Sequence, residues 1–154
     1  MKYIHLFEQF KYGHKFDLLD LFTITPEEVK ELFFKEMHKG NSDLENIQVF
    51  LDSGLIDPNV KNTWGWTALY LAAWSNSLEI AKLLISYGAN PNAKDQKNVT
   101  PLHIASEYNS LDVAKLLISS GADLKAKSYW ANTPLDLAKS QEMEELLTQK
   151  EDVL

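Results

Sequence analysis

Two consecutive stretches of the chain, residues 62–94 and 95–127, align without a gap. They read NTWGWTALYLAAWSNSLEIAKLLISYGANPNAK and DQKNVTPLHIASEYNSLDVAKLLISSGADLKAK, each 33 residues long. The run AKLLIS is identical in both, and a third copy starts at Ser128 with the tripeptide TPL at residues 133–135. A period of this length is typical of repeat proteins, whose neighbouring units bury a shared core and leave one face free for a partner. The stretch therefore predicts an array of small, stacked units.

Within each copy the spacing of apolar residues predicts two short helices joined by a turn. Thr67 and its equivalent Thr100 precede the first helix, where a hydroxyl can cap free backbone N–H groups. Asn76 falls in the turn and Gly88 follows the second helix, and both positions are expected to need a positive φ. The helices are expected over residues 68–75 and 78–87 in one copy, and over 101–108 and 111–120 in the next.

Residues 100–105, TPLHIA, match the ankyrin-repeat signature T-P-L-H-x-A at every position, and the chain resembles that family from about residue 33 to residue 148. The resemblance implies an all-α fold: an ankyrin-repeat α-solenoid of helix-turn-helix repeats with β-hairpin-like fingers. Residues 1–24 lie outside the repeat, and their apolar spacing predicts a helical N-terminal cap segment. The expected ankyrin-repeat domain is 25–154, with about four repeats: 25–61 (degenerate), 62–94, 95–127 and 128–154 (a C-terminal cap).

Several positions depart from the regular pattern. Asn98 and Ala131 replace the glycine that stands at Gly65, which predicts a distorted finger around Ala131. The last copy lacks about three residues between its helices, and its charged second helix suits a polar terminal cap. Upstream, a helix is expected over 26–39, with Thr25 as N-cap and Glu28 completing a capping box.

Composition narrows the classes of function. The 154 residues carry a net charge of −7, and all 15 basic residues are lysines. A negative chain without arginine is poorly suited to nucleic acid or to an anionic membrane. No apolar run approaches the roughly 20 residues that span a bilayer, so neither a nucleic-acid partner nor membrane insertion is expected. The absence of cysteine fits a reducing compartment, and we expect a cytoplasmic protein, with delivery into another cell as a secreted effector as the alternative.

No pattern typical of an active site is found. The four histidines share no metal-ligand spacing, and no phosphate-binding or nucleophile motif occurs. The resemblance implies that His103 hydrogen-bonds the threonine of its own motif. Acidic pairs such as Glu27-Glu28 lie on predicted short helices and are interpreted as solvated faces. We therefore expect no enzyme, no cofactor and no metal.

The resemblance implies that partners meet the finger tips and the exposed groove side of each first helix. All four tryptophans fall on this edge, and aromatic rings are enriched among binding hot spots. Trp64, Lys97 and Trp130 are equivalent positions and are expected to form a ladder along it. The candidate partner-binding residues are Trp64, Trp66, Trp74, Lys97, Tyr108, Tyr129 and Trp130.

Two of these rings have an alternative role in the fold. Trp66 can pack on an adjacent repeat, and Trp74 can stack with Tyr70 and Tyr108. The expected function is a non-enzymatic protein–protein interaction module that binds a protein partner through aromatic fingertips and the concave groove. The alternatives are a regulatory or inhibitory subunit of an enzyme and a self-associating structural protein. A monomer is expected, with weak self-association as the alternative.

Overall fold

The computed structural model describes residues 25–38 and 44–149. Within them the secondary structure is helical apart from one isolated antiparallel bridge, between Lys61 and Thr67, which confirms the all-α prediction. The N-terminal cap expected over residues 1–24 lies outside the described part. The elements are α2 (Pro26–His38), α3 (Leu44–Asp52), α4 (Ala68–Trp74), α5 (Leu78–Ser86), α6 (Pro101–Glu107), α7 (Leu111–Ser119), the 3-10 helix η2 (Leu135–Leu137) and α8 (Gln141–Gln149).

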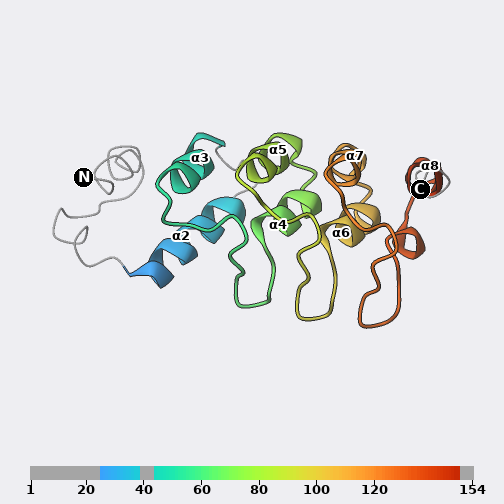
Figure 1. Cartoon of the computed structure of the whole chain (residues 1–154), viewed down its shortest axis with the longest axis horizontal. Helices are drawn as coiled ribbons and strands as arrows, with labels where there is room; N and C mark the ends of the chain where they lie inside the picture. The colour runs from blue at the N-terminus through green and yellow to red at the C-terminus, as the bar shows by residue number, and fades with distance from the viewer. Residues whose placement is uncertain (1–24, 39–43, 150–154) are drawn as a thin grey trace.

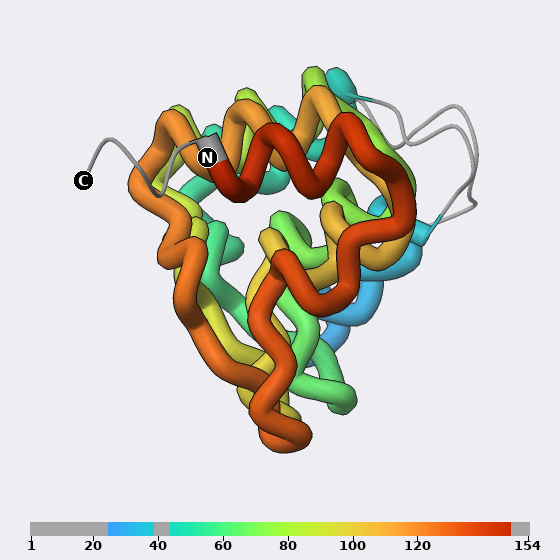
Figure 2. Tube along the Cα trace, turned by 90° about the vertical axis from the view of Figure 1, so that its right-hand side faces the viewer, coloured from blue at the N-terminus to red at the C-terminus, as the bar shows by residue number. Residues whose placement is uncertain are grey.

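The helices form two parallel rows (Figure 1). The inner row holds α2, α4, α6 and η2, and the outer row holds α3, α5, α7 and α8. Figure 2 shows the array end-on, with the loops between repeats projecting from one side of the helical layers. We call these loops the first finger (residues 61–67), the second finger (94–100) and the third finger (127–133). The fingers and the inner helices together border the concave side of the array.

The helix boundaries follow from local chemistry. The hydroxyls of Thr67 and Thr100 accept hydrogen bonds from the third residue of α4 and of α6, as expected of N-caps. Asn76 has a φ of 52°, and Gly88 has a φ of 88°, so both turns use the left-handed backbone that the sequence predicted. The predicted helices extend one residue too far at their C-terminal ends, because the last predicted residue is in each case the C-cap.

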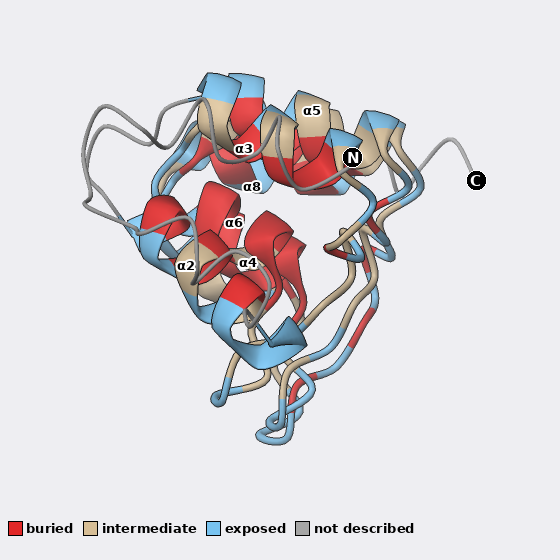
Figure 3. Ribbon diagram, turned by 90° about the vertical axis from the view of Figure 1, so that its left-hand side faces the viewer, coloured by how far each residue is buried: buried red, intermediate tan, exposed pale blue. Residues whose placement is uncertain are grey.

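The core lies where the inner and outer rows face each other (Figure 3). Ala72 and Ala105 have no exposed surface, and their small side chains allow α4 and α6 to pack closely. Leu84 and Leu117 are the equivalent fully buried residues of α5 and α7. Each repeat thus contributes the same few apolar positions to one continuous core, which makes neighbouring repeats depend on each other.

The two ends of the array differ from its middle. At α2, Thr25 and Glu28 form the predicted capping box, in which the Glu28 carboxylate accepts a hydrogen bond from the Thr25 backbone N–H and another from its hydroxyl. These bonds, the backbone one first, lower the pKa of the Glu28 carboxyl. At the other end the first helix shrinks to the single 3-10 turn η2, followed by α8, in agreement with the shortened last copy. Met143 and Leu147 of α8 are buried, and its other face is polar.

The three fingers have the same backbone turn. Gly65, Asn98 and Ala131 all have a left-handed φ, of 81°, 58° and 65° respectively. In each, the N–H of this residue donates to the carbonyl three positions earlier, at 3.0, 3.2 and 2.9 Å. The expected distortion around Ala131 is therefore wrong: the third finger keeps the shape of the others, and the alanine adopts a strained backbone to do so.

Polar contacts also join each repeat to the next. Asn92 spans one such junction, since its side chain donates to the Gly121 carbonyl at 2.9 Å and accepts from the Asp123 N–H at 2.7 Å. Asn59 makes the same pair of bonds one repeat earlier. Hydrogen bonds also link neighbouring fingers. Between the first and second fingers, Lys61 Nζ donates to the Lys94 carbonyl at 2.8 Å, and Gln96 Nε2 donates to the Thr63 carbonyl at 3.2 Å. Between the second and third fingers, the Tyr129 N–H donates to the Lys97 carbonyl at 2.8 Å.

Candidate partner-binding surface

Large aromatic side chains are exposed along the finger edge and the groove. Trp64 and Trp130 each keep 57% of their surface exposed, and Tyr129 keeps 76%. Trp74 and Tyr108 are also exposed, on the groove side of α4 and at the end of α6. Monomeric proteins seldom leave several large rings in water without a reason, so this edge is the part of the described surface best suited to contact a partner.

The first finger carries a stack of three rings. The Trp66 ring lies parallel to that of Tyr70, with 5.0 Å between centroids and 7° between planes, and the Trp64 ring is tilted by 32° against it, with 5.2 Å between centroids. Trp66 is half-buried as a result and contributes to the fold as well as to the surface. Burial, followed by the charge of Asp95, raises the pKa of the Tyr70 hydroxyl, which therefore stays neutral at ordinary pH.

Trp74 and Tyr108 meet in the groove. Their rings pack edge to face, with 6.1 Å between centroids and 78° between planes. No ring contact joins Trp74 to Tyr70 in the described residues, because the Tyr70 ring stacks on Trp66 instead. The pair joins the last residue of α4 to the residue that follows α6, and both rings remain exposed.

The third finger pairs an aromatic ring with a cation from the second. Lys97 Nζ lies 5.2 Å from the centroid of the Trp130 ring, a cation–π contact between neighbouring fingers. Tyr129 packs edge-on against Trp130 at 6.0 Å. Trp64, the remaining member of the expected ladder, has its ring contact with Trp66 inside its own finger. The ladder thus joins the second and third fingers, while the first holds a separate stack.

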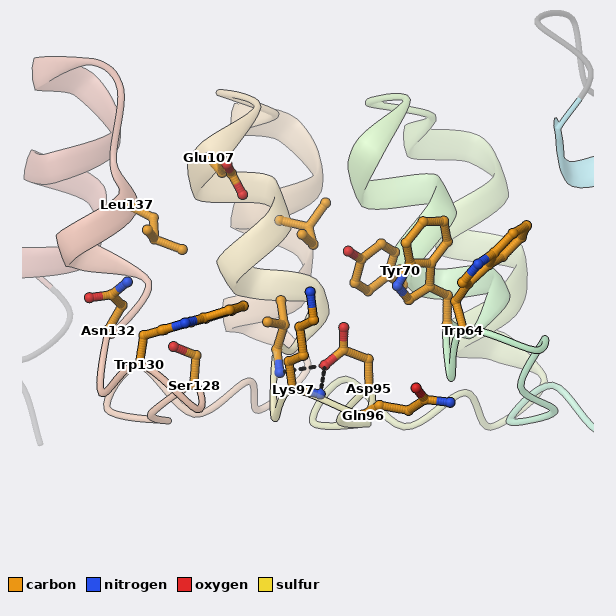
Figure 4. Close-up of a pocket in the computed structure, with 13 residues that line it drawn as sticks. Trp64, Tyr70, Asp95, Gln96, Lys97, Glu107, Ser128, Trp130, Asn132 and Leu137 are labelled. Carbon is orange, nitrogen blue, oxygen red and sulfur yellow. Dashed lines mark hydrogen bonds between the residues drawn. The ribbon is translucent and has the colours of Figure 1, made fainter.

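An open cavity of about 420 Å³ lies between the fingers and the inner helices (Figure 4). Aromatic rings stand at both ends of it, Trp64 with Tyr70 at one and Trp130 at the other, and Lys97 and Asp95 lie between them. The lining residues are Trp64, Trp66, Tyr70, Asp95, Gln96, Lys97, Val99, Ile104, Glu107, Ser128, Trp130, Asn132 and Leu137. A cavity lined by aromatic rings, aliphatic side chains and polar groups suits a side chain or a short segment of a partner.

Four of the predicted residues line this cavity or its rim, and three lie apart from it. Trp64, Trp66, Lys97 and Trp130 line it, whereas the ring pair in the groove and Tyr129 at the fingertip do not. Reasoning from the sequence missed Asp95 and Ser128 as lining residues. The sequence did contain an indication, because equivalent positions of the three repeats carry three different side chains, Asn62, Asp95 and Ser128.

His103 has a structural role. Its Nδ1 accepts from the Thr100 backbone N–H at 3.2 Å and lies 2.8 Å from the Thr100 hydroxyl, as the resemblance implied. Its other nitrogen, Nε2, donates to the Asn132 carbonyl at 2.9 Å, which ties α6 to the third finger. Burial lowers the pKa of the imidazole, although hydrogen bonds and nearby carboxylates oppose the shift. Within residues 25–38 and 44–149, no three His, Asp or Glu side chains gather as they would around a metal ion.

Paired helices in two rows, with fingers on one side and exposed aromatic rings along them, define a helical-repeat protein with an open concave face. The chain belongs to the ankyrin-repeat family: the family model for ankyrin repeats, which has three copies, matches residues 37–128, more than half of the chain. Members of this family are generally non-enzymatic modules of protein–protein interaction. In the part of the chain that the structure describes, no helix has the length and apolar character to cross a bilayer.

The chain is also similar to curated proteins named ankyrin repeat, SAM and basic leucine zipper domain-containing protein 1. Those of Saimiri boliviensis boliviensis and Ateles geoffroyi are each 39% identical over 64 residues, which is 42% of this chain. That of Neofelis nebulosa is 38% identical over 68 residues, or 44% of this chain. The matches span only 13% to 14% of the relatives' length, so they support the repeat and nothing about the other domains in that name.

Proposed function

We propose that this chain binds a protein partner through its aromatic fingertips and its concave groove. The observation that carries the proposal is the exposure of five aromatic rings, one of which, Trp130, also makes a cation–π contact with Lys97. The binding residues we propose are Trp64, Trp66, Trp74, Lys97, Tyr108, Tyr129 and Trp130. We assign Trp64 and Trp130 the largest share of the binding free energy, because each is more than half exposed and borders the cavity.

The composition supports a protein partner over other classes. A net charge of −7 without any arginine opposes binding to the phosphates of nucleic acid. The rings offer apolar area, and Lys97 offers a positive charge within a negative protein, which together suit a partner surface with apolar groups and some acidic residues. The cysteine-free sequence is compatible with action in a reducing cytoplasm.

The test is capture of the partner by the full chain and by a Trp64→Ala, Trp130→Ala double variant. We expect the double variant to lose the partner that the native chain captures from its own cell extract, because truncation at a hot spot costs about 2 kcal/mol or more. Its thermal melt should change little. As matched controls, Lys82→Ala and Lys115→Ala on the outer helices should capture the partner as the native chain does.

Two outcomes would contradict the proposal. A collapsed melt in the double variant would show that the rings support the fold. Light scattering that detects a concentration-dependent dimer, lost in Trp64→Ala, would show that the rings mediate self-association instead.

A further inference from the structure

The three fingers differ in the first residue of their turn, whose side chain can accept hydrogen bonds from the backbone N–H groups of the same finger. Asn62, Asp95 and Ser128 occupy this position in the first, second and third finger. Asn62 Oδ1 accepts hydrogen bonds from the backbone N–H groups two and four residues further on, both at 3.0 Å. Asp95 Oδ1 does the same, at 2.8 Å for each bond. In these two fingers one side-chain oxygen satisfies two backbone donors.

This arrangement is missing from the third finger, where Ser128 holds the position. The N–H groups of Trp130 and Asn132 make no hydrogen bond with residues 25–38 or 44–149, and the Ser128 hydroxyl also has no partner there, although the residue is only 7% exposed. A buried hydroxyl is normally hydrogen-bonded, and leaving it unpaired is unfavourable. The two N–H groups are the counterparts of those that an acceptor oxygen holds in the other two fingers, and the Ser128 hydroxyl of the same finger is buried without a partner among the described residues.

These donors border the cavity. Ser128, Trp130 and Asn132 line it together with Lys97, whose ammonium group stands above the Trp130 ring (Figure 4). No ion pair joins Lys97 to a carboxylate in the part of the chain that the structure describes. The third-finger side of the cavity therefore offers two amides, a hydroxyl and an ammonium group, all of which can donate to an anion.

Two carboxylates also line the cavity and oppose a second negative charge. Asp95 and Glu107 both belong to the repeat that precedes the third finger, and one oxygen of Asp95 is already held by two N–H groups. Among the residues that line the cavity, those with unpaired donors on the third finger are Ser128, Trp130 and Asn132. An anion is accordingly favoured at that side of the cavity and disfavoured at the side of Tyr70.

We propose that the third-finger side of the cavity binds the carboxylate of an aspartate or glutamate side chain from the protein partner, an inference that rests on the proposed function. One carboxylate oxygen accepts from the N–H groups of Trp130 and Asn132, as Asp95 Oδ1 does for its own finger. The other accepts from the Ser128 hydroxyl and the Lys97 ammonium group. Apolar groups beside the acidic residue of the partner contact the Trp130 ring and Leu137.

The test uses the full chain, labelled with nitrogen-15, and two peptide probes. Acetyl-Leu-Glu-Leu-amide carries the carboxylate, and acetyl-Leu-Gln-Leu-amide is its neutral match. At low salt we expect the glutamate peptide to bind about tenfold more tightly, with saturating shifts of the Trp130 and Asn132 amide signals below about 10 mM. Lys97→Gln should reduce this preference and its dependence on salt.

The decisive variants restore the missing acceptor within the chain. Ser128→Asp and Ser128→Asn should each close the third finger as Asp95 and Asn62 close theirs, so both should fold and both should lose the preference for the glutamate peptide. Ser128→Ala leaves the two amides open and should keep part of it. The inference is overturned if the native chain binds the two peptides equally, if neither peptide shifts these amides, or if Ser128→Asn keeps the full preference.

Further results distinguish a failure of the carboxylate site from a failure of the proposed function. Tighter binding of acetyl-Leu-Leu with a free C-terminus would overturn the assignment to an acidic side chain in favour of a chain end. If Ser128→Asn captures the native partner unchanged while the Trp64→Ala, Trp130→Ala variant loses it, the proposed function stands and the carboxylate site is wrong. If the double variant captures the partner normally while the peptide preference holds, the proposed function is wrong.

Discussion

One residue of the third finger, Ala131, shows how the fold tolerates an unfavourable backbone conformation. Ala131 adopts a φ of 65°, where its Cβ is crowded and glycine is at ease. The turn persists because its hydrogen bond and its neighbouring finger hold it in place. Ala131→Gly should therefore raise the free energy of unfolding by about 0.5–1 kcal/mol, the left-handed penalty less the greater freedom of glycine in the unfolded chain. Urea denaturation measures this difference.

Gly65 provides the matched reverse change. A Cβ at this position would lie 3.1 Å from Gln96 Cγ and 3.1 Å from the Gln96 backbone nitrogen, at a φ of 81°. Gly65→Ala should consequently lower the stability. A third finger that loses stability on Ala131→Gly would mean that the alanine methyl group contributes packing that outweighs its strain.

Residue by residue, the sequence predicted which rings belong to the finger edge better than how they pack. The period placed Trp64 and Trp130 at the tips, and both are exposed. It could not show that Tyr70 lies flat against Trp66, because that contact joins a loop residue to a helix residue and depends on the angle between the two. The period does show that Ser128 replaces an asparagine and an aspartate, but it could not show that the hydroxyl is buried without a partner among the described residues.

Among the elements, α6 has the most specific N-terminal cap. The Thr100 hydroxyl accepts from the His103 backbone N–H at 3.5 Å, and the His103 ring accepts in return from the Thr100 backbone N–H. The bonded imidazole is neutral, with its proton on Nε2 facing Asn132. A second proton on Nδ1 would face the Thr100 N–H, so protonation breaks the cap. This geometry acts in the same direction as burial, the main cause of the lowered pKa.

The cap predicts a dependence of stability on pH. A histidine whose pKa in the folded state is below its ordinary value of 6.5 binds protons more readily when the chain is unfolded. Its contribution is therefore complete above pH 6.5 and is lost as the pH falls from 6.5 through the folded pKa. Thermal melts between pH 8 and pH 5 should show a decline in the native chain that is smaller in His103→Gln. Equal declines in the two proteins would assign the effect to other groups.

The elements themselves were predicted from the sequence almost completely, because capping residues and apolar spacing act locally. The exception is η2, where three missing residues leave room for one 3-10 turn between Thr133 and α8. Asp136 replaces the histidine of the motif there and accepts from both the Thr133 N–H and its hydroxyl, at 2.7 and 2.8 Å. These bonds lower the pKa of the Asp136 carboxyl. The capping hydrogen bonds are therefore kept, although a 3-10 turn takes the place of the α-helix that follows them in the other repeats.

At the scale of the whole molecule, stability depends on the junctions between repeats. Asn92 makes two hydrogen bonds across one junction, to Gly121 and Asp123. Asn92→Ala should lower the free energy of unfolding by about 1–3 kcal/mol, because both partner groups lose a bond that folding had secured. Hydrogen exchange should show the largest loss of protection in the repeats on either side of this junction.

Lys125 supplies the control, since it holds the equivalent position one repeat later and its side chain makes no such bond in the described part of the chain. Lys125→Ala should change stability by less than about 0.5 kcal/mol. Similar effects of the two substitutions would show that the asparagine bonds contribute little. Lys125 stands at the junction between repeat 95–127 and the last repeat, where the two earlier junctions have Asn59 and Asn92. We propose on these grounds that the last repeat is a terminal cap.

The bonds between neighbouring fingers have a consequence for recognition. Lys61, Gln96 and Tyr129 fasten each finger to the next before any partner arrives. The tips are thus held at a fixed interval, and little conformational entropy remains to be lost on their side of a complex. We therefore expect the proposed partner to be bound only when its apolar and acidic groups are spaced to match the fingers.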